Sequence, residues 1–488
     1  MLKKMKGKPL SGVTQGKIRP KDVSLPFLSK AFFYLNQIKK LMRKFSLVLM
    51  GLCLVAMSAM AAKKVQKEVN LFPDGTPIED WFLDSSVPEL SELGKIYSLD
   101  DYRIYSDPTQ IQTEKIQAVI DLAAENGGGV IVVPEGIYKT GSLFFKQGTR
   151  LYLKQGAVLL GSEFIRDFPV VMTRIEGEWC RYFAALINAE GLDGFSITGN
   201  GGIIDGNGAP YWQAFRQRRQ WNMACTNKDE QRPRLVFMNG CTNVYVANVV
   251  FQNSPFWSSH YYKCDHVKIV NVRIFSPVKP IASASADGID MDVCHHFLIK
   301  GCRITVNDDA ICFKGGKYPG ADTDPNNGPN HRILIEDVLF DNTTGSCMTC
   351  GSESIHAYNI LMRNCRVEGG GTMLQLKMRP DTAQRYEYIT VENMSGFCRN
   401  LLGIAPWTQF FDLKGQPDKI PSHANNITLK NINLQCNNFM GVSGSPDYDL
   451  TDFAFENINI ETNQTNWRRD AFVSYTMKNV VAGGQPQE

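Results

Sequence analysis

The chain has 488 residues, of which 43% are hydrophobic and 21% are charged, a composition typical of a globular protein. Its formal net charge of +3 is too small to favour a surface that coats a polyanion, so composition gives no support for nucleic-acid binding. The length allows one large domain or several smaller ones. The patterns along the chain decide between these possibilities.

Residues 42–61 have the pattern of an export signal. Met42 is followed by two basic residues, an apolar stretch over about residues 45–56, and the small-x-small sequence Ala-Met-Ala at 59–61. The apolar stretch is too short to cross a bilayer comfortably. We therefore expect a cleaved signal peptide, a secreted or periplasmic protein and no membrane span, and we interpret residues 1–41 as an upstream artefact.

The segment after the signal divides into a lead and a helix. We expect residues 62–104 to form an extended N-terminal lead. The sequence "TEKIQAVIDLAAENGG" (113–128) is amphipathic with a helical period and ends in glycines, which predicts a short helix. Four β-like runs follow it.

An irregular repeat occupies the rest of the chain. The pattern apolar-x-apolar-x-(Asn/Asp/Gly)-apolar-x-apolar predicts two short strands joined at a residue that tolerates left-handed backbone. Stacking such coils at about 4.8 Å buries apolar faces that two strands alone cannot bury. We therefore predict an all-β, right-handed parallel β-helix over residues 105–488, capped by the helix at 113–128. The first apolar residues of the eight clearest units are Val244, Val267, Phe297, Ile333, Ile360, Ile389, Ile427 and Phe453.

Three long insertions separate the repeats, at residues 206–234, 314–330 and 401–424. In a β-helix we expect such insertions to rim a cleft on one face, where a substrate is held. The thirteen cysteines leave disulfides and buried free thiols open as alternatives. Cys347 and Cys350 form a CxxC without a second pair at metal spacing, so the sequence predicts neither a metal nor a cofactor.

Two segments crowd carboxylates together, "SADGIDMD" (285–292) and "NDDAICFKGG" (307–316). Asp287 and Asp308 are separated by about one coil, so stacking sets them on neighbouring coils, with Asp309 alongside. Carboxylates this close repel when ionised, and one retains its proton. A protonated and an ionised carboxyl are what glycoside hydrolysis requires. We interpret Asp290 and Asp292 as bend residues only.

These two motifs resemble those of the polygalacturonases, glycoside hydrolase family 28. The resemblance continues, in the family's order, through "GIIDGNGAPYW", "QNSPFWSSH" and "CGSES", and it covers roughly residues 105–460. It implies a right-handed parallel β-helix that hydrolyses α-galacturonosyl linkages in pectin with inversion. By the same resemblance, Asp308 is the general acid, and Asp287 and Asp309 activate the water.

The chain departs from the family pattern at the substrate-binding cations. Gly345 stands where the family has a histidine, and Gln375 where it has an arginine, while Lys377 is retained. Glutamine carries no charge and replaces a bidentate arginine poorly. Arg379 lies two residues beyond Lys377 on the same strand face and is a candidate replacement. The resemblance therefore favours an exo-acting or oligosaccharide-acting galacturonidase, or a rhamnogalacturonan-type hydrolase, over an endo-polygalacturonase.

Trp257 and His260, one coil before the aspartates, are further substrate-binding candidates. An aromatic face at Trp257 could stack on a sugar, and His260 resembles a family position near the substrate, although core roles remain open for both. The expected partner is a pectic polysaccharide or oligosaccharide, bound by a monomer. A pectate-lyase-like enzyme and a non-catalytic carbohydrate-binding solenoid remain alternatives, since a fold does not dictate function.

Overall fold

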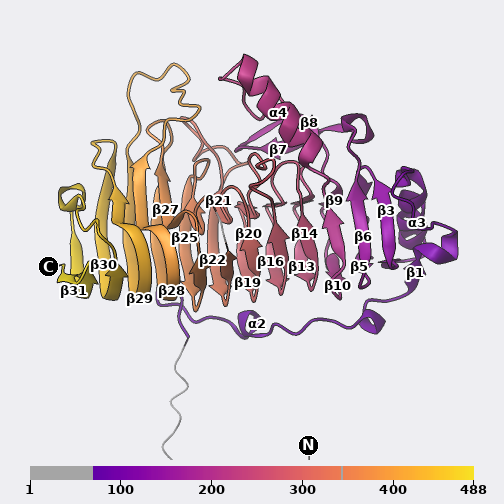
Figure 1. Ribbon diagram of the computed structural model, residues 1–488, viewed down its shortest axis with the longest axis horizontal. Helices are drawn as coiled ribbons and strands as arrows, with labels where there is room; N and C mark the ends of the chain where they lie inside the picture. Colours follow the sequence, from indigo (N-terminus) through magenta and orange to yellow (C-terminus); the bar gives the residue numbers. More distant parts are fainter. Residues whose placement is uncertain (1–69, 342–343, 488) are drawn as a thin grey trace, which may run out of the picture. The chain divides into compact units, whose positions relative to one another are not determined.

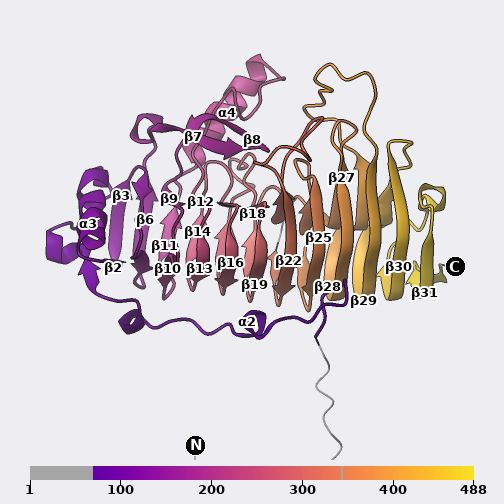
Figure 2. The same cartoon turned by 180° about the vertical axis from the view of Figure 1, so that it is seen from behind.

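The computed structural model describes residues 70–341 and 344–487, so the predicted signal peptide lies outside the described residues. The described chain winds into a parallel β-helix whose strands form three columns (Figures 1 and 2). Each coil contributes one strand to each column, and each strand pairs in parallel with its equivalent in the next coil. The predicted fold class is confirmed.

The first column consists of β1 (Ile96–Ser98), β2 (Gly129–Val133), β5 (Thr149–Leu153), β10 (Ser196–Gly199), β13 (Thr242–Ala247), β16 (Asp265–Val270), β19 (His295–Lys300), β22 (Pro329–Glu336) and β25 (His356–Arg363). The second column consists of β3 (Gly136–Thr140), β6 (Ala157–Gly161), β11 (Ile203–Asp205), β14 (Val250–Gln252), β17 (Arg273–Phe275), β20 (Arg303–Thr305), β23 (Leu339–Asp341) and β26 (Arg366–Glu368). The third column consists of β4 (Leu143–Phe144), β9 (Ile187–Glu190), β12 (Val236–Asn239), β15 (Ser259–Tyr262), β18 (Ile289–Asp292), β21 (Ile311–Lys314), β24 (Met348–Cys350) and β27 (Thr372–Met378). Near the C-terminus the longer strands β28 (Arg385–Pro406), β29 (Ser422–Val442), β30 (Tyr448–Glu461) and β31 (Tyr475–Ala482) continue the stack, and β32 (Gln485–Pro486) pairs with β31 in antiparallel.

The predicted repeat register is correct at every one of the eight units. Val244 pairs with Val267, Val267 with Phe297, and the remaining predicted residues follow in the same order up to Phe453. The predicted left-handed bends are also present, with φ of 54° at Asn271 and 57° at Asn364. Asparagines at one bend bond to each other along the stack, as where Asn393 Nδ2 donates to Asn364 Oδ1 over 2.9 Å. The bends are therefore stabilised from coil to coil.

The predicted capping helix is α3 (Thr113–Glu125), which packs on β2, β4 and β5 at the open end of the stack. Residues 70–104 run along one side of the β-helix, at the bottom of Figures 1 and 2. They include α2 (Asp80–Leu83), and their Phe72, Ile78 and Phe82 pack against outward-facing leucines of β19, β22 and β25. The predicted lead thus covers an apolar face, and its end supplies β1.

Two elements were not predicted from the sequence. Helix α4 (Ala209–Trp221) begins with a proline in its first turn and buries Tyr211, Trp212 and Phe215. Strands β7 (Val170–Ile175) and β8 (Glu178–Phe183) form an antiparallel hairpin outside the three columns. Both lie above the third column in Figure 1. They therefore add walls to one face of the β-helix.

All twelve cysteines in the described part of the chain are free thiols, and all except Cys180 are buried. Burial raises the pKa of Cys347 and Cys350, which places them in the core as neutral thiols. Within residues 70–341 and 344–487, no helix combines the length and apolar character needed to cross a membrane.

Candidate active site

The carboxylate cluster lies where two neighbouring coils enter the third column. Asp287 precedes β18, Asp308 and Asp309 precede β21, and the two strands pair in parallel from Ile289 and Ile311 onward. The backbone N–H of residue 288 donates to the Asp309 carbonyl over 3.0 Å, which joins the two segments directly. The prediction that these aspartates occupy adjacent coils is correct.

Asp308 and Asp309 have opposite protonation preferences. Burial raises the pKa of Asp308 to about 8, and the negative charges of Asp287 and Asp309 add to the rise. Burial also acts on Asp309, but Lys377, whose Nζ lies 2.6 Å from Asp309 Oδ2, brings its pKa below the usual range. The backbone N–H of Ser346 donates to Asp309 Oδ1 over 2.8 Å. A protonated carboxyl thus stands beside an ionised one.

Lys314 holds the acidic groups on the other side of the cluster. Its Nζ lies 3.6 Å from Asp287, 3.5 Å from Asp290 and 3.5 Å from Glu353, measured to their carboxylate oxygens. Burial and the charge of Asp290 raise the pKa of Asp287, and burial raises the pKa of Asp290 to about 7. The interpretation of Asp290 and Asp292 as bend residues is wrong, because both lie within β18.

Lys377 and Gln375 extend the site along β27. The Lys377 ammonium lies 4.5 Å from the centre of the Trp407 ring, so it contacts both an aromatic face and the Asp309 carboxylate. Gln375 is half-buried, and its Nε2 donates to the Leu376 carbonyl over 3.3 Å. The structure thus brings Lys377, but not Gln375, into contact with a catalytic candidate.

Arg379 does not reach the cluster. It is fully buried, and its guanidinium donates to both carboxylate oxygens of Asp381, over 2.8 and 2.7 Å. It also donates to the carbonyls of Gln409 and Phe410, which fixes the loop between β28 and β29. The structure therefore corrects the interpretation of Arg379 as a substrate contact, because an internal carboxylate neutralises its charge.

Trp257 and His260 lie beneath the cluster. The Trp257 side chain is 3% exposed, stacks on Phe256 with ring centres 4.8 Å apart, and lies 4.7 Å from Lys314 Nζ. His260 is completely buried, and burial lowers its pKa to about 4. Arg234 Nη1 donates to His260 Nδ1 over 2.6 Å. Both residues form the floor of the site, and neither presents a surface to a sugar in this arrangement.

Gly345 packs directly against the backbone of the general-acid candidate. A Cβ added there would lie 2.4 Å from the Asp308 carbonyl carbon and 2.5 Å from Asp309 N. No imidazole can therefore replace this glycine without moving the carboxylate segment. The close contact gives Asp308 a rigid backbone support instead of a histidine neighbour.

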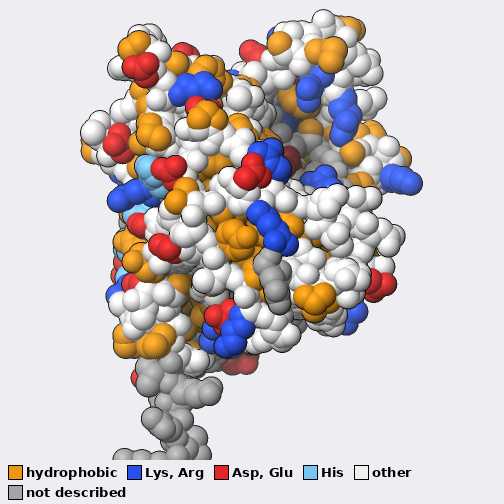
Figure 3. Space-filling model, turned by 90° about the vertical axis from the view of Figure 1, so that its left-hand side faces the viewer, with side chains coloured by type: hydrophobic (Ala, Val, Ile, Leu, Met, Phe, Trp, Pro, Cys, Tyr) orange, Lys and Arg blue, Asp and Glu red, His pale blue; other side chains and the backbone are white. Residues whose placement is uncertain are grey.

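A pocket of about 1030 Å³ opens in front of Asp308. Its walls come from α4 and the segment that follows it, from residues 283–285, and from Gln409 and Phe410 in the loop after β28. Arg216 and Arg219 of α4 line it as well. Figure 3 shows the molecule hollowed between two raised parts. Two of the three predicted insertions therefore rim the pocket, as expected.

The model of one known protein family matches more than half of the chain. The model of the glycosyl hydrolases family 28 matches residues 170–469, which include all the carboxylates of the cluster. The chain belongs to this family. The resemblance predicted from the motifs is thereby confirmed.

Relatives of this family 28 protein include enzymes from bacteria and plants. It is 22% identical over 475 residues to an exo-poly-alpha-D-galacturonosidase of Dickeya chrysanthemi, covering 86% of this chain and 76% of that protein. It is 30% identical over 227 residues to a probable polygalacturonase of Vitis vinifera, covering 45% of this chain but only 44% of that protein. Among solved structures, an exopolygalacturonase from Thermotoga maritima superposes with a TM-score of 0.64 at 22% identity, over 82% of this chain and 93% of that one. This structural likeness supports the fold.

Several residues of the site were not predicted from the sequence. Lys314 lies within the motif "NDDAICFKGG". A lysine in an otherwise apolar strand could have indicated that it belongs to the site. Glu353 lies in the matching "CGSES" stretch. Arg174 of β7 donates to Asp292 over 3.0 Å, and no sequence signal links residues so far apart. In this family 28 protein, the hairpin thus holds the C-terminal end of β18.

Proposed function

We propose that this protein is an exported, inverting glycoside hydrolase that cleaves α-galacturonosyl linkages in pectic polysaccharide or oligosaccharide. The observation that carries the proposal is the pairing of Asp308, whose raised pKa keeps it protonated, with the ionised Asp309. Asp308 donates its proton to the leaving glycosidic oxygen, and Asp309 takes a proton from the attacking water. Asp287 shares water activation only once it is ionised, since burial and the charge of Asp290 raise its pKa and the Lys314 ammonium opposes only part of that rise.

The form of the pocket favours removal of sugar units from the end of the polysaccharide. Helix α4 and the loop after β28 both contribute walls, so the space before Asp308 is bounded on more than one side. The names of the Dickeya and Thermotoga relatives, both exo-acting, agree with such an action. Arg216 and Arg219 supply positive charge at this pocket for a galacturonate carboxylate. A rhamnogalacturonan-type substrate would require the same carboxylate contact beside a neutral sugar.

The test compares the protein with its Asp308→Asn variant and with Asp322→Asn, a control on an exposed loop. Each is incubated with homogalacturonan, rhamnogalacturonan and reduced oligogalacturonates, while reducing ends and near-ultraviolet absorbance are followed together. We expect reducing ends without absorbance, released as monomers or short products, with a loss of at least 10²-fold in Asp308→Asn alone. Absorbance from unsaturated products would instead establish a lyase, and turnover unaffected by Asp308→Asn would remove Asp308 from the mechanism.

Two further measurements address inversion and export. Nuclear magnetic resonance of the first product should show the β-anomer, since single displacement by water inverts an α-linkage. An initial α-anomer would indicate retention. Fractionation of the native host, with N-terminal sequencing, should find the mature chain outside the cytoplasm and beginning after Ala61. A cytoplasmic chain with residues 42–61 intact would contradict export.

A further inference from the structure

Five of the seven histidines of the chain lie together on the first column, away from the carboxylate cluster of the third column. The coil-to-coil register places Asp265 beside His295 and His295 beside His331. Histidine side chains reach the surface along one edge of the molecule in Figure 3. The glycosidase site uses none of these residues. We call Asp265, His295 and His296 the histidine cluster.

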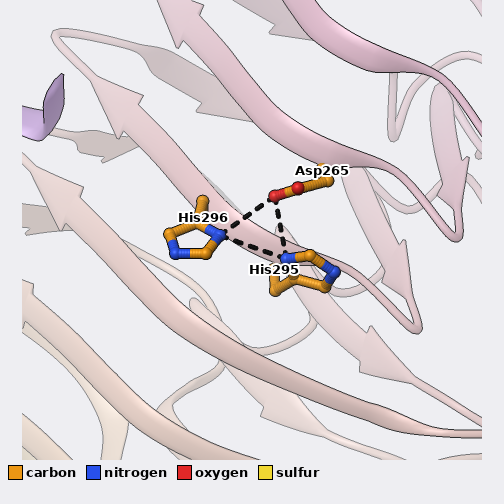
Figure 4. Close-up of side chains that lie close together, drawn as sticks. All are labelled: Asp265, His295 and His296. Carbon is orange, nitrogen blue, oxygen red and sulfur yellow. Dashed lines mark hydrogen bonds and ion pairs between the residues drawn. The ribbon is translucent and has the colours of Figure 1, made fainter.

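The ring nitrogens of the histidine cluster converge on one carboxylate oxygen. Asp265 Oδ1 lies 2.8 Å from His295 Nδ1 and 3.0 Å from His296 Nδ1, and these two nitrogens are 3.1 Å apart (Figure 4). His266 Nδ1 also lies 2.8 Å from the same oxygen. A carboxylate oxygen offers about two lone pairs, so it can accept hydrogen bonds from at most two of these three imidazole nitrogens. Hydrogen bonding alone accounts poorly for this convergence.

We propose that Asp265, His295 and His296 bind a divalent transition-metal ion of the zinc class. In a tetrahedral zinc site with ligands at about 2.0–2.1 Å, ligand atoms are about 3.3 Å apart. The three separations of 2.8, 3.0 and 3.1 Å are within a few tenths of an ångström of that value. The donor set, two imidazole nitrogens and one carboxylate oxygen, suits zinc, and the fourth position is open to water.

The surroundings of the cluster give the ligands fixed orientations. The His296 ring stacks on His266 with centres 4.5 Å apart, and His295 stacks on His331 at 5.0 Å. The His296 and His295 side chains are 24% and 39% exposed, so an ion can enter from solvent. Positive φ of 48° at His296 turns that residue toward its neighbour. The ligands therefore need little rearrangement to close on an ion.

The ion would join two neighbouring coils where the lead covers them. Asp265 begins β16 and both histidine ligands begin β19. Trp81 of α2 lies edge-on to His266 at 5.1 Å, and Phe82 lies 6.3 Å from His296. An ion at the cluster would therefore crosslink the two coils directly beneath the lead. The expected role is stabilisation of this face.

The test uses the protein without an affinity tag, treated with a chelator and dialysed, and titrated with zinc or cobalt. We expect one zinc per chain, a cobalt absorption band typical of a tetrahedral site, and a rise in Tm on zinc addition. Losing a ligand in His295→Ala or Asp265→Asn should weaken zinc binding by at least the 10–100-fold that follows loss of a ligand's supporting partner. His423→Ala, which removes a single exposed histidine 3.5 Å from Asp449, is the matched control and should bind zinc as before.

A second acidic group requires its own variant. Asp287, Asp290 and Cys312 also bring three potential ligand atoms together, so Asp287→Asn is titrated in parallel. Zinc binding that survives His295→Ala and Asp265→Asn, or that is abolished by Asp287→Asn alone, would overturn the proposal. So would the absence of a cobalt band in the unsubstituted protein, a measurement that does not depend on any variant folding.

Discussion

We expect the ion pair between Lys377 and Asp309 to set the acid limb of the kcat/KM profile for hydrolysis. The Lys377 and Asp309 side chains are only 14% and 6% exposed, and their charged atoms are 2.6 Å apart. Lys377→Met removes the cation and leaves burial as the dominant influence, which raises the pKa of a carboxyl. Asp309 should then hold its proton at pH values where it is now ionised and able to act as a base.

The size of the effect follows from the burial of the pair. Removing one partner of a buried ion pair costs about 3–5 kcal/mol, and each pKa unit corresponds to about 1.4 kcal/mol. The acid limb of the kcat/KM profile should therefore move upward by about two to four pH units. At a pH within the old plateau but at least about two units below the new limb, kcat/KM should fall by about 100-fold or more and should recover as the pH rises.

The assay is kcat and KM on a reduced oligogalacturonate between pH 3 and pH 9, for the unsubstituted protein, Lys377→Met and Lys377→Arg. Lys377→Arg retains the cation and should leave the acid limb close to its original position. If Lys377→Met raises KM and leaves the acid limb unmoved, then Lys377 serves substrate binding and the reasoning from the ion pair is refuted. In Lys377→Arg, the alkaline limb of the profile, which Asp308 sets with its pKa of about 8, should stay within about one pH unit of its position in the unsubstituted protein.

Three substitutions test the structural supports of the site and the fold. Asp381→Asn leaves the Arg379 guanidinium buried without its counter-charge and should lower the unfolding free energy by about 3–5 kcal/mol in urea titrations; a change below 1 kcal/mol would mean that carbonyl bonds suffice. Gly345→Ala forces a Cβ to within 2.4 Å of the Asp308 backbone and should reduce kcat at least tenfold with a smaller effect on KM; an unchanged kcat would show that this contact does not position the acid. Asn393→Ala loses two ladder hydrogen bonds, to Asn364 and from Asn431, at a residue with φ 56°, and should lower Tm. Asn393→Gly loses the same bonds but adopts that φ freely, so it should lower Tm less; equal losses would mean that backbone strain plays no part.

The β-helix could be predicted because its determinants are local. Each coil touches only its neighbours, so alternation of apolar residues and an asparagine such as Asn271 or Asn364 at the bend suffice to set the register. Helix α4 could not be predicted in the same way. Its sequence is rich in arginine and glutamine, and it is held by the burial of Trp212 and Phe215 against segments distant in the chain.

The juxtaposition of Asp287, Asp308 and Asp309 could be predicted from their motifs, but the burial of their neighbours could not. Trp257 and His260 stand at positions whose exposure depends on whether another segment covers them. Arg174 of the hairpin donates a hydrogen bond to Asp292, and the buried Arg234 donates one to His260. These contacts bury the residues beneath the cluster. The histidine cluster also depends on stacking, since its ligands become neighbours only through the register of β16 and β19.

The buried lysines and arginine near the site are already paired with carboxylates of the protein. This bears on how the substrate is bound when Gln375 stands at the family's arginine position. Lys314 is balanced by acidic groups, Lys377 by Asp309 and Arg379 by Asp381, so these cations already have internal counter-charges. A galacturonate carboxylate entering the pocket therefore gains little from them. The arginines of α4 lie at the pocket wall, where Arg216 binds a carbonyl and retains further donors. In the proposed function, recognition of the acidic sugar thus falls to an inserted helix, which explains how a glutamine can occupy the family's arginine position.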